Sequence, residues 1–304
     1  MSPWPSRVRI VEVGPRDGLQ NEPNPVTVET RVALIRALAD AGLREIEAGS
    51  FVSPKWVPQM AGTPGVLAAL DRSVGVSYPV LVPNERGWAD ARGAGVDHIA
   101  IFTAASESFC RKNINCSIDE SLDRFAAFVP EALAMGVRVR GYLSTVVGCP
   151  YEGPVDPARV AEVAARLVDL GCEEVSLGDT IGVGTPASVA RMLEAVLERV
   201  LVERVAVHFH DTYGQALANI CEAMRLGVTV VDAAVAGLGG CPYAPGAGGN
   251  VATEDVVYLL NGLGVATNVD LGALARAGWA ICDALGRAPS SKVSVALRAA
   301  CERK

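Results

Sequence analysis

The feature that most constrains the fold of this chain is a regular alternation of short apolar runs with longer segments of helical periodicity. The apolar runs are rich in β-branched residues, which favour strands. They lie at residues 8–13, 45–51, 76–82, 98–103, 137–143, 174–177, 205–210 and 230–235. Eight predicted strands separated by predicted helices are typical of a closed parallel barrel.

The segments between the strands carry apolar residues at helical spacing. In residues 28–41, four such side chains share one face of a helix, and in residues 157–170 another four do the same. They are Val32, Ile35, Leu38 and Ala39 in the first segment and Val160, Val163, Leu167 and Leu170 in the second. Several strands also follow a glycine, which supplies the left-handed residue that ends a helix. These glycines are Gly42, Gly95, Gly136, Gly171 and Gly227.

We therefore predict an α/β fold, a TIM (β/α)8 barrel with extra C-terminal helices. No linker or change of composition divides the chain, so residues 1–304 are expected to form one domain, with the barrel at about 7–260 and the helices at about 261–304. The strands are largely apolar, as expected when both faces of a sheet are buried. An open doubly wound sheet is the alternative, but residues 14–18, Gly-Pro-Arg-Asp-Gly, lack its GxGxxG fingerprint.

Charge and cysteine content narrow the class of protein. The net charge of −7 offers no basic stripe for nucleic acid. The eight cysteines form no CxxC and have irregular spacing, which favours a reduced cytoplasmic setting; only Cys110 and Cys116 are a possible pair. Because the first strand is predicted to begin within a few residues of Met1, no signal peptide or presequence is expected. No apolar run reaches the length of about 18 residues that a membrane span needs, so no membrane partner is expected.

The most distinctive short motif is His208-Phe209-His210-Asp211, at the end of a predicted strand. Alternate residues of a strand face the same side, so the two histidines project together, roughly 7 Å apart at the backbone. Two imidazoles on one face can hold a divalent metal, although a pair of buried, hydrogen-bonded histidines is the alternative. Asp211 lies on the opposite face and is expected to cap the following helix with Thr212.

Polar residues gather where the predicted strands end, which is where barrels of this kind place their sites. They are Arg16, Asp17, Glu47, Ser50, Tyr142, Ser144, Asp179, Thr180, His208 and His210. His98 and Glu45 instead open their strands at the opposite end of the barrel, so structural roles are expected for both. The segment 111–115, Arg-Lys-Asn-Ile-Asn, is predicted to be a long loop at the mouth.

Barrel closure brings the last strand beside the first, so Asp17, His208, His210 and Asn250 can converge. A carboxylate, two imidazoles and an amide oxygen suit Mg²⁺ or Mn²⁺, although imidazole also accepts Zn²⁺, Fe²⁺ or Co²⁺. Two positions of an octahedron would stay open for a substrate that bears a hydroxyl and a carbonyl oxygen. The glycine-rich segment 237–250 is predicted to be a functional flexible loop, and its thiol, Cys241, is a candidate catalytic group or a packed, inert one.

Four segments of the chain resemble the signatures of 3-hydroxy-3-methylglutaryl-CoA (HMG-CoA) lyases. They are residues 11–22, 50–60, 208–219 and 237–250. The resemblance extends from about residue 7 to 298. The wider superfamily, which includes isopropylmalate and homocitrate synthases and carboxyltransferase domains, shares only the Arg-Asp pair and the HxH within a metal-dependent TIM barrel.

The resemblance implies a metal-assisted carbon–carbon lyase that acts on an acyl-CoA, expected as a cytoplasmic homodimer. It implies that Asp17, His208, His210 and Asn250 are the metal ligands. It further implies that Arg16 stabilises an enolate oxygen, that Cys241 acts as an acid or base, and that Asp17 or His208 is the base. Substrate-binding positions implied by the resemblance are Gln20, Glu47, Ser50, Asn113, Tyr142, Asp179 and Thr180.

Three rival functions stay open from the sequence. A lyase for a longer 3-hydroxy-3-alkylglutaryl-CoA would share these signatures, because only the volume of its pocket would differ. An acyl-CoA-condensing synthase of the superfamily would carry a further C-terminal region, for which this chain leaves no space. A catalytically silent barrel that acts as a binding scaffold would not need the full ligand set or Cys241.

Overall fold

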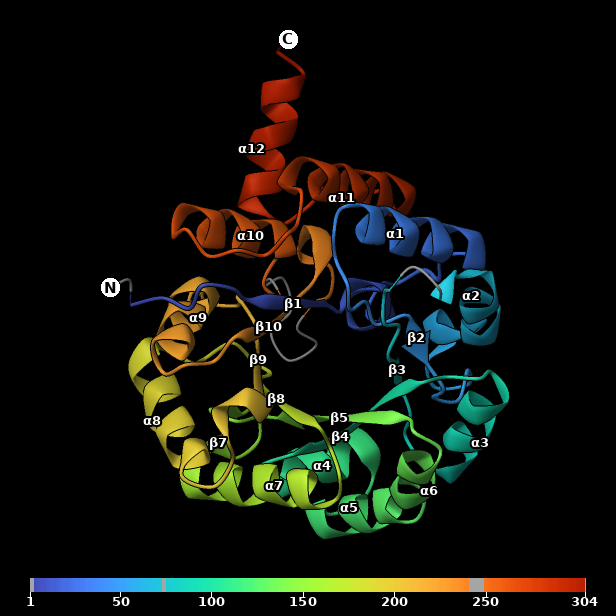
Figure 1. Cartoon of the computed structure of the whole chain (residues 1–304), viewed down its shortest axis with the longest axis vertical. Helices are drawn as coiled ribbons and strands as arrows, with labels where there is room; N and C mark the ends of the chain where they lie inside the picture. Colours follow the sequence, from blue (N-terminus) through green and yellow to red (C-terminus); the bar gives the residue numbers. More distant parts are fainter. Residues whose placement is uncertain (1–2, 73–74, 241–248, 304) are drawn as a thin grey trace.

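A computed structural model describes residues 3–72, 75–240 and 249–303. Its main sheet contains eight parallel strands, arranged in the order β1-β10-β9-β8-β5-β4-β3-β2 within these residues. At the seam, β1 meets the segment just before β2: the Glu12 amide donates to Glu45 O (3.0 Å) and the Glu47 amide donates to Glu12 O (2.9 Å). The sheet therefore closes into the predicted barrel, seen end-on in Figure 1.

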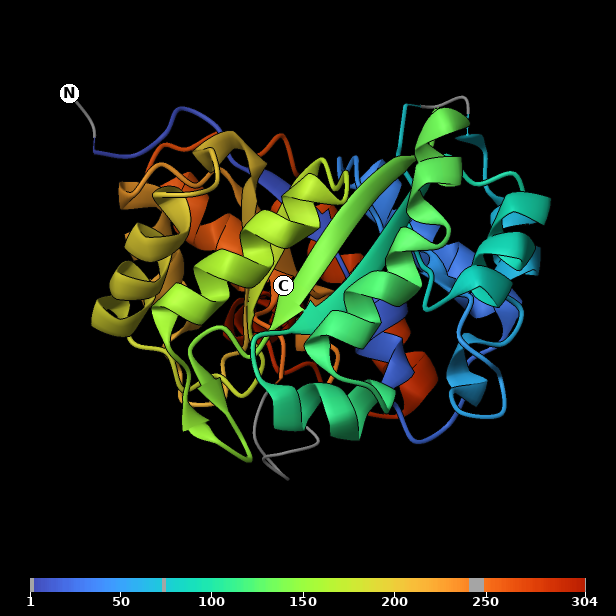
Figure 2. The same cartoon turned by 90° about the horizontal axis from the view of Figure 1, so that it is seen from below.

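The strands fall within or next to the predicted apolar runs, but most are shorter. They are β1 (Arg9–Glu12), β2 (Gly49–Ser50), β3 (Val80–Leu81), β4 (His98–Ala104), β5 (Arg138–Ser144), β8 (Glu174–Asp179), β9 (Val205–Phe209) and β10 (Val230–Ala233). The long central pair, β4 and β5, runs in register from His98 opposite Arg138 to Ala104 opposite Ser144 (Figure 2). A small antiparallel hairpin of β6 (Gly148–Cys149) and β7 (Gly153–Pro154) was not expected.

Helices form a ring outside the strands (Figure 1). They are α1 (Val28–Asp40), α2 (Thr63–Ala69), α3 (Glu85–Gly93), α4 (Glu107–Ile114), α5 (Ile118–Ala126), α6 (Val129–Ala134), α7 (Pro157–Asp169), α8 (Pro186–Leu197), α9 (Ala216–Arg225), α10 (Thr253–Gly262), α11 (Leu271–Leu285) and α12 (Lys292–Cys301). The last two, α11 and α12, lie in the range expected for C-terminal helices, and α12 projects away from the ring (Figure 1).

The predicted helical faces form part of the core. In α1 the side chains of Val32, Ile35 and Leu38 are buried, and Thr27 caps the helix by accepting a hydrogen bond from the Thr30 amide at 3.2 Å. The glycines expected to end helices adopt positive φ, from 67° at Gly95 to 111° at Gly171. The helix boundaries could be predicted because each rests on this local chemistry.

The segment 111–115 corrects the sequence-based prediction of a loop. Residues up to Ile114 belong to α4. Ser106 starts this helix by accepting a hydrogen bond from the Phe109 amide at 3.1 Å, and Asn115 ends it with φ of 53°. The density of polar residues suggested a loop, but a serine cap and a left-handed asparagine are sufficient to define a short helix.

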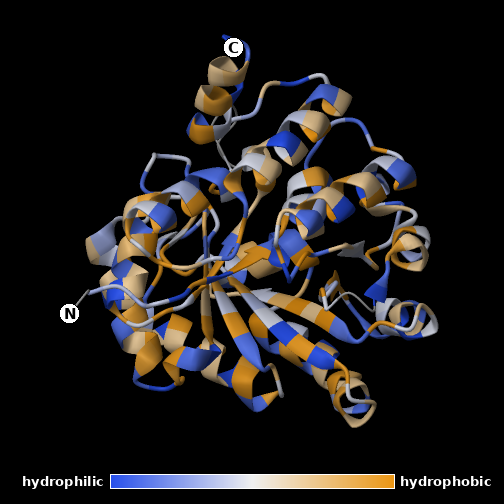
Figure 3. Cartoon of the chain, turned by 45° about the horizontal axis from the view of Figure 1, so that its top comes forward, coloured by the Kyte–Doolittle hydropathy of each residue, from blue (hydrophilic) through white to orange (hydrophobic). Residues whose placement is uncertain are grey.

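The interior of the barrel is more charged than apolar strands would suggest, and the strands in Figure 3 mix hydrophobic with hydrophilic residues. Arg140 is 1% exposed and pairs with Glu174 (2.8 Å) and Asp232 (2.7 Å). Arg9 joins Glu174 to Glu45 at the N-terminal end of the strands. A layer of compensated charge therefore fills the lower half of the barrel.

Candidate active site

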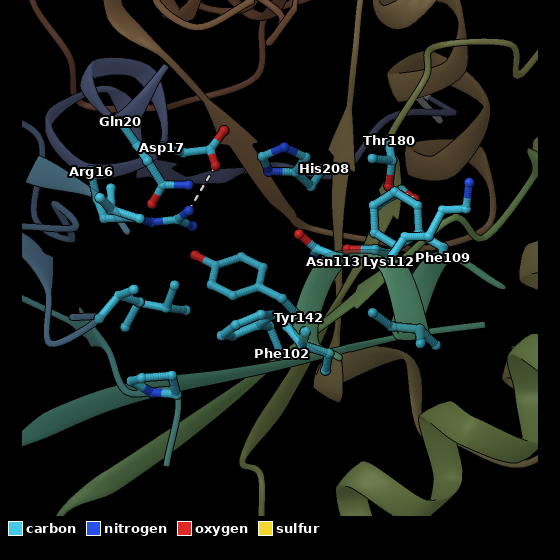
Figure 4. A pocket seen from close by; sticks show the side chains of 18 of the residues that line it. Arg16, Asp17, Gln20, Phe102, Phe109, Lys112, Asn113, Tyr142, Thr180 and His208 are labelled. Carbon is cyan, nitrogen blue, oxygen red and sulfur yellow. Dashed lines mark hydrogen bonds and ion pairs between the residues drawn. The ribbon is translucent and has the colours of Figure 1, made fainter. Parts of the chain in front are cut away.

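A cavity of about 740 Å³ opens at the C-terminal ends of the strands (Figure 4). Several predicted site residues line it: Arg16, Asp17, Gln20, Asn113, Tyr142, Ser144, Thr180, His208 and His210. Side chains from α4 and α5 form part of its wall, including Phe109, Arg111, Lys112 and Arg124. The barrel thus gathers residues from widely separated parts of the sequence at one mouth.

A tight helical turn directly after β1 (η1, Gly14–Gly18) carries Arg16 and Asp17 into this cavity. The amides of residues 16 to 18 all donate to Val13 O, at 3.2, 2.7 and 3.2 Å. Buried Glu12 anchors the turn by accepting hydrogen bonds from the amides of Gly14 and Val235, both at 2.8 Å. Gly18 allows the turn to pack closely, since a Cβ there would lie 2.6 Å from Leu238 Cβ.

Asp17, His208 and His210 form a group whose ligand atoms all lie within 4.8 Å of one another. The predicted alternation holds, because both imidazoles face the mouth while Asp211 accepts a hydrogen bond from the amide of Ala216, the first residue of α9 (3.0 Å). Buried His210 Nδ1 has no hydrogen-bond partner within residues 3–72, 75–240 and 249–303. A carboxylate and two imidazoles at this spacing, one with an unpartnered nitrogen, fit a divalent metal.

Asn250 lies beside this group, as predicted. It forms a β-bridge with His210, and its amide nitrogen donates to Asp17 Oδ2 at 2.8 Å and to Leu238 O at 3.1 Å. The oxygen and nitrogen of an asparagine amide exchange places by a simple flip. The residue is therefore placed where it could add an oxygen ligand to the other three.

The pKa shifts of Asp17 and His210 favour the protonation states that a metal requires, whereas the hydrogen bond and charge of Asp232 outweigh burial and raise the pKa of His208. Burial alone raises the pKa of Asp17, but Arg16 and His208 outweigh it and lower the pKa to about 2. Burial and then the neighbouring His208 lower the pKa of His210 to about 4. At neutral pH the carboxylate is therefore ionised and the His210 imidazole neutral, as ligands must be.

Arg16 is held rigidly from two sides. Its Nε donates to Glu47 Oε2 at 2.8 Å and its Nη1 to Asp17 Oδ1 at 2.7 Å. The guanidinium lies 5.4 Å from the ring centre of Tyr142. The buried Tyr142 hydroxyl has no hydrogen-bond partner among the described residues and points toward Arg16 in Figure 4. Glu47 thus acts through Arg16 and does not itself line the cavity.

Two other predicted residues lie behind the cavity wall. Asp179 accepts a hydrogen bond from the Gly184 amide at 2.7 Å, and burial raises its pKa to about 6. Ser50 accepts a hydrogen bond from the Val52 amide at 3.1 Å and donates to Leu81 O at 3.4 Å. The hydroxyl of Ser50 is therefore occupied by the backbone and does not line the cavity.

The remaining predictions concern Cys241, the possible pair of Cys110 and Cys116, and His98. Cys241 lies outside the described residues. Cys110 and Cys116, the possible pair, are free thiols, and burial raises the pKa of both. His98 is buried at the N-terminal end of β4, with Nδ1 3.0 Å from Ser77 Oγ, in agreement with the structural role predicted for it.

Sequence reasoning missed Asp232, which contacts His208 from the neighbouring strand β10 at 3.3 Å. It also missed the partners of Asp232, namely Arg140 and Ser176. The available signal was the single charged residue in the apolar run 230–235, and the two arginines, Arg138 and Arg140, in the run 137–143. No helix among the described residues is long and apolar enough to cross a membrane.

The fold and the site define a TIM barrel with a candidate metal centre at its mouth. The HMGL-like family model matches residues 7–281, and the chain belongs to this family. It is 59% identical over 293 residues to the mitochondrial hydroxymethylglutaryl-CoA lyase of Bos taurus, covering 96% of this chain and 90% of that protein.

Solved structures agree with this membership. The hydroxymethylglutaryl-CoA lyase of Pseudomonas aeruginosa matches with a TM-score of 0.96 and 56% identity, covering 98% of this chain and 99% of that one. An HMG-CoA lyase of Acinetobacter baumannii, solved with coenzyme A and 3-methylmalate, matches with a TM-score of 0.91 and 34% identity, over 96% and 95% of the two chains.

Proposed function

We propose that this chain is a carbon–carbon lyase that cleaves 3-hydroxy-3-methylglutaryl-CoA to acetyl-CoA and acetoacetate. The observation that carries the proposal is the convergence of Arg16 with Asp17, His208 and His210 at the cavity, in a chain 59% identical to a lyase of that name. The rival synthase and scaffold readings gain no support from the family membership.

The proposed metal is Mg²⁺ or Mn²⁺, held by Asp17, His208, His210 and Asn250. When bound there, such an ion lowers the pKa of a coordinated hydroxyl and so prepares the substrate for loss of a proton. The mixed carboxylate, imidazole and amide donor set, without a thiolate, supports this choice of ion.

Side chains of the protein then carry out the individual steps of the cleavage. A base beside the C3 hydroxyl, Asp17 or His208, takes its proton, and the O–H electron pair becomes the new carbonyl of acetoacetate. The C2–C3 bond breaks, and its electron pair forms the enolate of acetyl-CoA. Arg16, held by Glu47, stabilises the enolate oxygen, because a fixed positive charge is most effective where negative charge develops.

A proton from Cys241 then converts the enolate to acetyl-CoA. If this thiol is the acid, Cys241→Ala should lower kcat by about 10²–10⁴ and leave metal affinity unchanged. The matched control is Cys221→Ala, on α9, which should alter neither quantity. Near-normal turnover of Cys241→Ala would transfer the acid role to another group.

The CoA portion is proposed to lie along α4. Arg111, Lys112 and Asn113 line the mouth there, and Arg124 on α5 adds a further positive charge. These cations suit the phosphates of an acyl-CoA. The complex of the Acinetobacter relative with coenzyme A supports an acyl-CoA ligand.

One assay tests the function directly. The purified protein is stripped with a chelator and supplied with Mg²⁺, Mn²⁺ or no metal. A panel of 3-hydroxy-3-alkylglutaryl-CoA esters with growing 3-substituents is then offered, and release of the CoA ester product is followed. The 3-methyl ester should give the highest kcat/KM, and only with metal. A preference for a long-chain ester would assign a different lyase, and metal-independent turnover would contradict the mechanism.

Two further properties belong to the same proposal. We expect a homodimer, which size-exclusion chromatography with light scattering would test. We also expect a cytoplasmic location, which fractionation of the source cells would test.

A further inference from the structure

Asp232 is the centre of a buried hydrogen-bond cluster just below the proposed metal ligands. It is 1% exposed on β10 and is contacted from three other strands. Arg140 on β5 donates to both of its oxygens, at 2.7 and 3.0 Å, and Ser176 on β8 donates at 2.7 Å. His208 on β9 places Nδ1 3.3 Å from the same carboxylate. The hydrogen bonds from Arg140 and Ser176 therefore fix the orientation of the carboxylate that faces His208.

This contact dictates which nitrogen of His208 carries the proton. An ionised carboxylate only accepts hydrogen bonds, so Nδ1 must donate and hold the hydrogen of the neutral ring. The lone pair is then on Nε2. Both roles proposed for His208, metal ligand and base, need that lone pair at the cavity.

His210 provides the contrast. Its Nδ1 is buried and has no hydrogen-bond partner in the part of the chain that the structure describes, so no carboxylate there fixes the tautomer of its ring. The two imidazoles of the motif, with ring centres 5.4 Å apart, therefore differ in how they are supported. One is oriented by the protein before any ligand arrives, and the other is not.

We propose that Asp232, itself held by Arg140 and Ser176, is a positioning residue that fixes the tautomer and orientation of His208. This inference rests on the proposed metal site and lyase activity. It adds to them Asp232, which is not among the described residues that line the cavity. Hydrogen bonds of this kind to a metal-binding histidine set its tautomer and raise its basicity.

The chain suits a direct test, because it has only three histidines. Protein labelled with ¹⁵N-histidine and freed of metal is studied by NMR at about pH 9, well above the usual imidazole pKa near 6.5. The ¹⁵N shifts report which ring nitrogen is protonated, and His98→Gln and His210→Gln assign the signals. The wild type should show His208 protonated at Nδ1. Protonation at Nε2 would overturn the proposal without any variant at position 232.

Asp232→Asn is the decisive variant. Its single side-chain oxygen should turn toward Arg140, which leaves the NH₂ group facing His208 Nδ1. The proton of His208 should then move to Nε2, and the affinity for Mn²⁺, measured by calorimetry, should fall about 10–100-fold. The single substitution Asp232→Asn leaves Arg140 without the negative charge of Asp232. The double variant Asp232→Asn/Arg140→Met removes both charges of this pair and so provides a second test.

Glu174→Gln is the matched control, since it removes another buried carboxylate that Arg140 contacts but does not touch His208. It should keep the Nδ1 proton and the wild-type Mn²⁺ affinity. If folded Asp232→Asn and the double variant also keep both, Asp232 has no positioning role. The NMR measurement of the tautomer requires neither metal nor substrate. If the wild type bound no Mn²⁺, the proposed function would be contradicted. The NMR result would still decide the role of Asp232.

Discussion

The two halves of the barrel interior differ in how completely their polar atoms are satisfied. In the lower half, Arg140 joins Glu174 and Asp232, and Arg9 joins Glu174 and Glu45, so each of these charges has a partner. Buried charges require such pairing, because a lone ion loses its hydration without compensation. This half acts as a scaffold that fixes the strands.

The mouth is left incomplete. Among the described residues, Glu47 Oε1, Tyr142 Oη, Asp179 Oδ1 and His210 Nδ1 are buried near the mouth and have no hydrogen-bond partner. In the lower half His98 Nε2 is also without a hydrogen bond in this part of the chain, but it lies 3.6 Å from Glu173. Each such atom costs about 1–3 kcal/mol when it stays unsatisfied. These four atoms lie close to Arg16 and the proposed metal ligands, which supports a ligand-binding role for this end of the barrel.

The largest effect should come from breaking the scaffold. Arg140→Met leaves Asp232 and part of Glu174 uncompensated at the centre of the barrel, so the free energy of unfolding should fall by about 3–5 kcal/mol. Urea denaturation measures this change. The control is Arg111→Met at the mouth, where the side chain is 67% exposed and the expected change is within about 0.5 kcal/mol. Equal losses for both variants would contradict the division into scaffold and mouth.

The next effect concerns catalysis rather than stability. Arg16→Gln removes the fixed cation beside Asp17, so kcat should fall by about 10²–10³ while KM changes much less. Steady-state kinetics with 3-hydroxy-3-methylglutaryl-CoA separates the two parameters. An unchanged kcat with a much higher KM would make Arg16 a substrate-binding residue only.

The fold was predictable because its signals are local or periodic. The apolar runs, the helical faces and the terminating glycines each depend on a few neighbouring residues, and the HxH motif depends only on strand alternation. Strand lengths were less accessible: β2 is reduced to Gly49–Ser50 although residues 45–51 read as one run. The bridges around Glu12, Glu45 and Glu47 replace it at the seam, and those depend on barrel closure.

The residues that support His208 were not predictable, because their contacts also depend on how the strands are ordered in the closed barrel. Asp232, Arg140 and Ser176 lie far apart in sequence, and only the order of β10, β5 and β8 around the barrel brings them together. Their sequence signal was one or two polar residues in a largely apolar strand, which indicates an unusual position but not its partner. Ser50 shows the opposite case, since its place at a strand end was right and its hydroxyl is nevertheless occupied by the backbone.

A third prediction uses the opposite pKa shifts of the two halves. At the mouth, burial raises the pKa of Asp179 from 3.8 to about 6. In the scaffold, burial is outweighed by Arg140 and His208, so the pKa of Asp232 is lowered. A raised acid favours the folded state while protonated, so its contribution is full below about pH 3.8 and is lost as the pH rises through about 6. The contribution of Asp232 instead is lost as the pH falls below about 4.

Asp179→Asn isolates the first of these contributions. The unfolding free energy of wild type minus that of the variant should fall by about 1–3 kcal/mol between about pH 4 and pH 6, and stay level above that. Urea denaturation at a series of pH values gives this difference. A difference that does not vary with pH would show that Asp179 is not a desolvated acid in the folded protein.

The smallest effect should come from the histidine that belongs to the scaffold. His98 is 1% exposed, with Nδ1 3.0 Å from Ser77 Oγ, and burial followed by the charge of Arg138 lowers the pKa of its ring, so it stays neutral. Glutamine can keep a polar contact with Ser77 and carries no charge either. His98→Gln should therefore cost only about 0.5–1.5 kcal/mol of stability, the range of one hydrogen bond, and leave kcat and Mn²⁺ affinity unchanged.

The same substitution at His210 should abolish Mn²⁺ binding and leave stability unchanged, because among the described residues its Nδ1 contributes no hydrogen bond to the fold. If His98→Gln weakened metal binding as strongly as His210→Gln, the two ends of the barrel would be coupled, and the lower half would not be a passive scaffold.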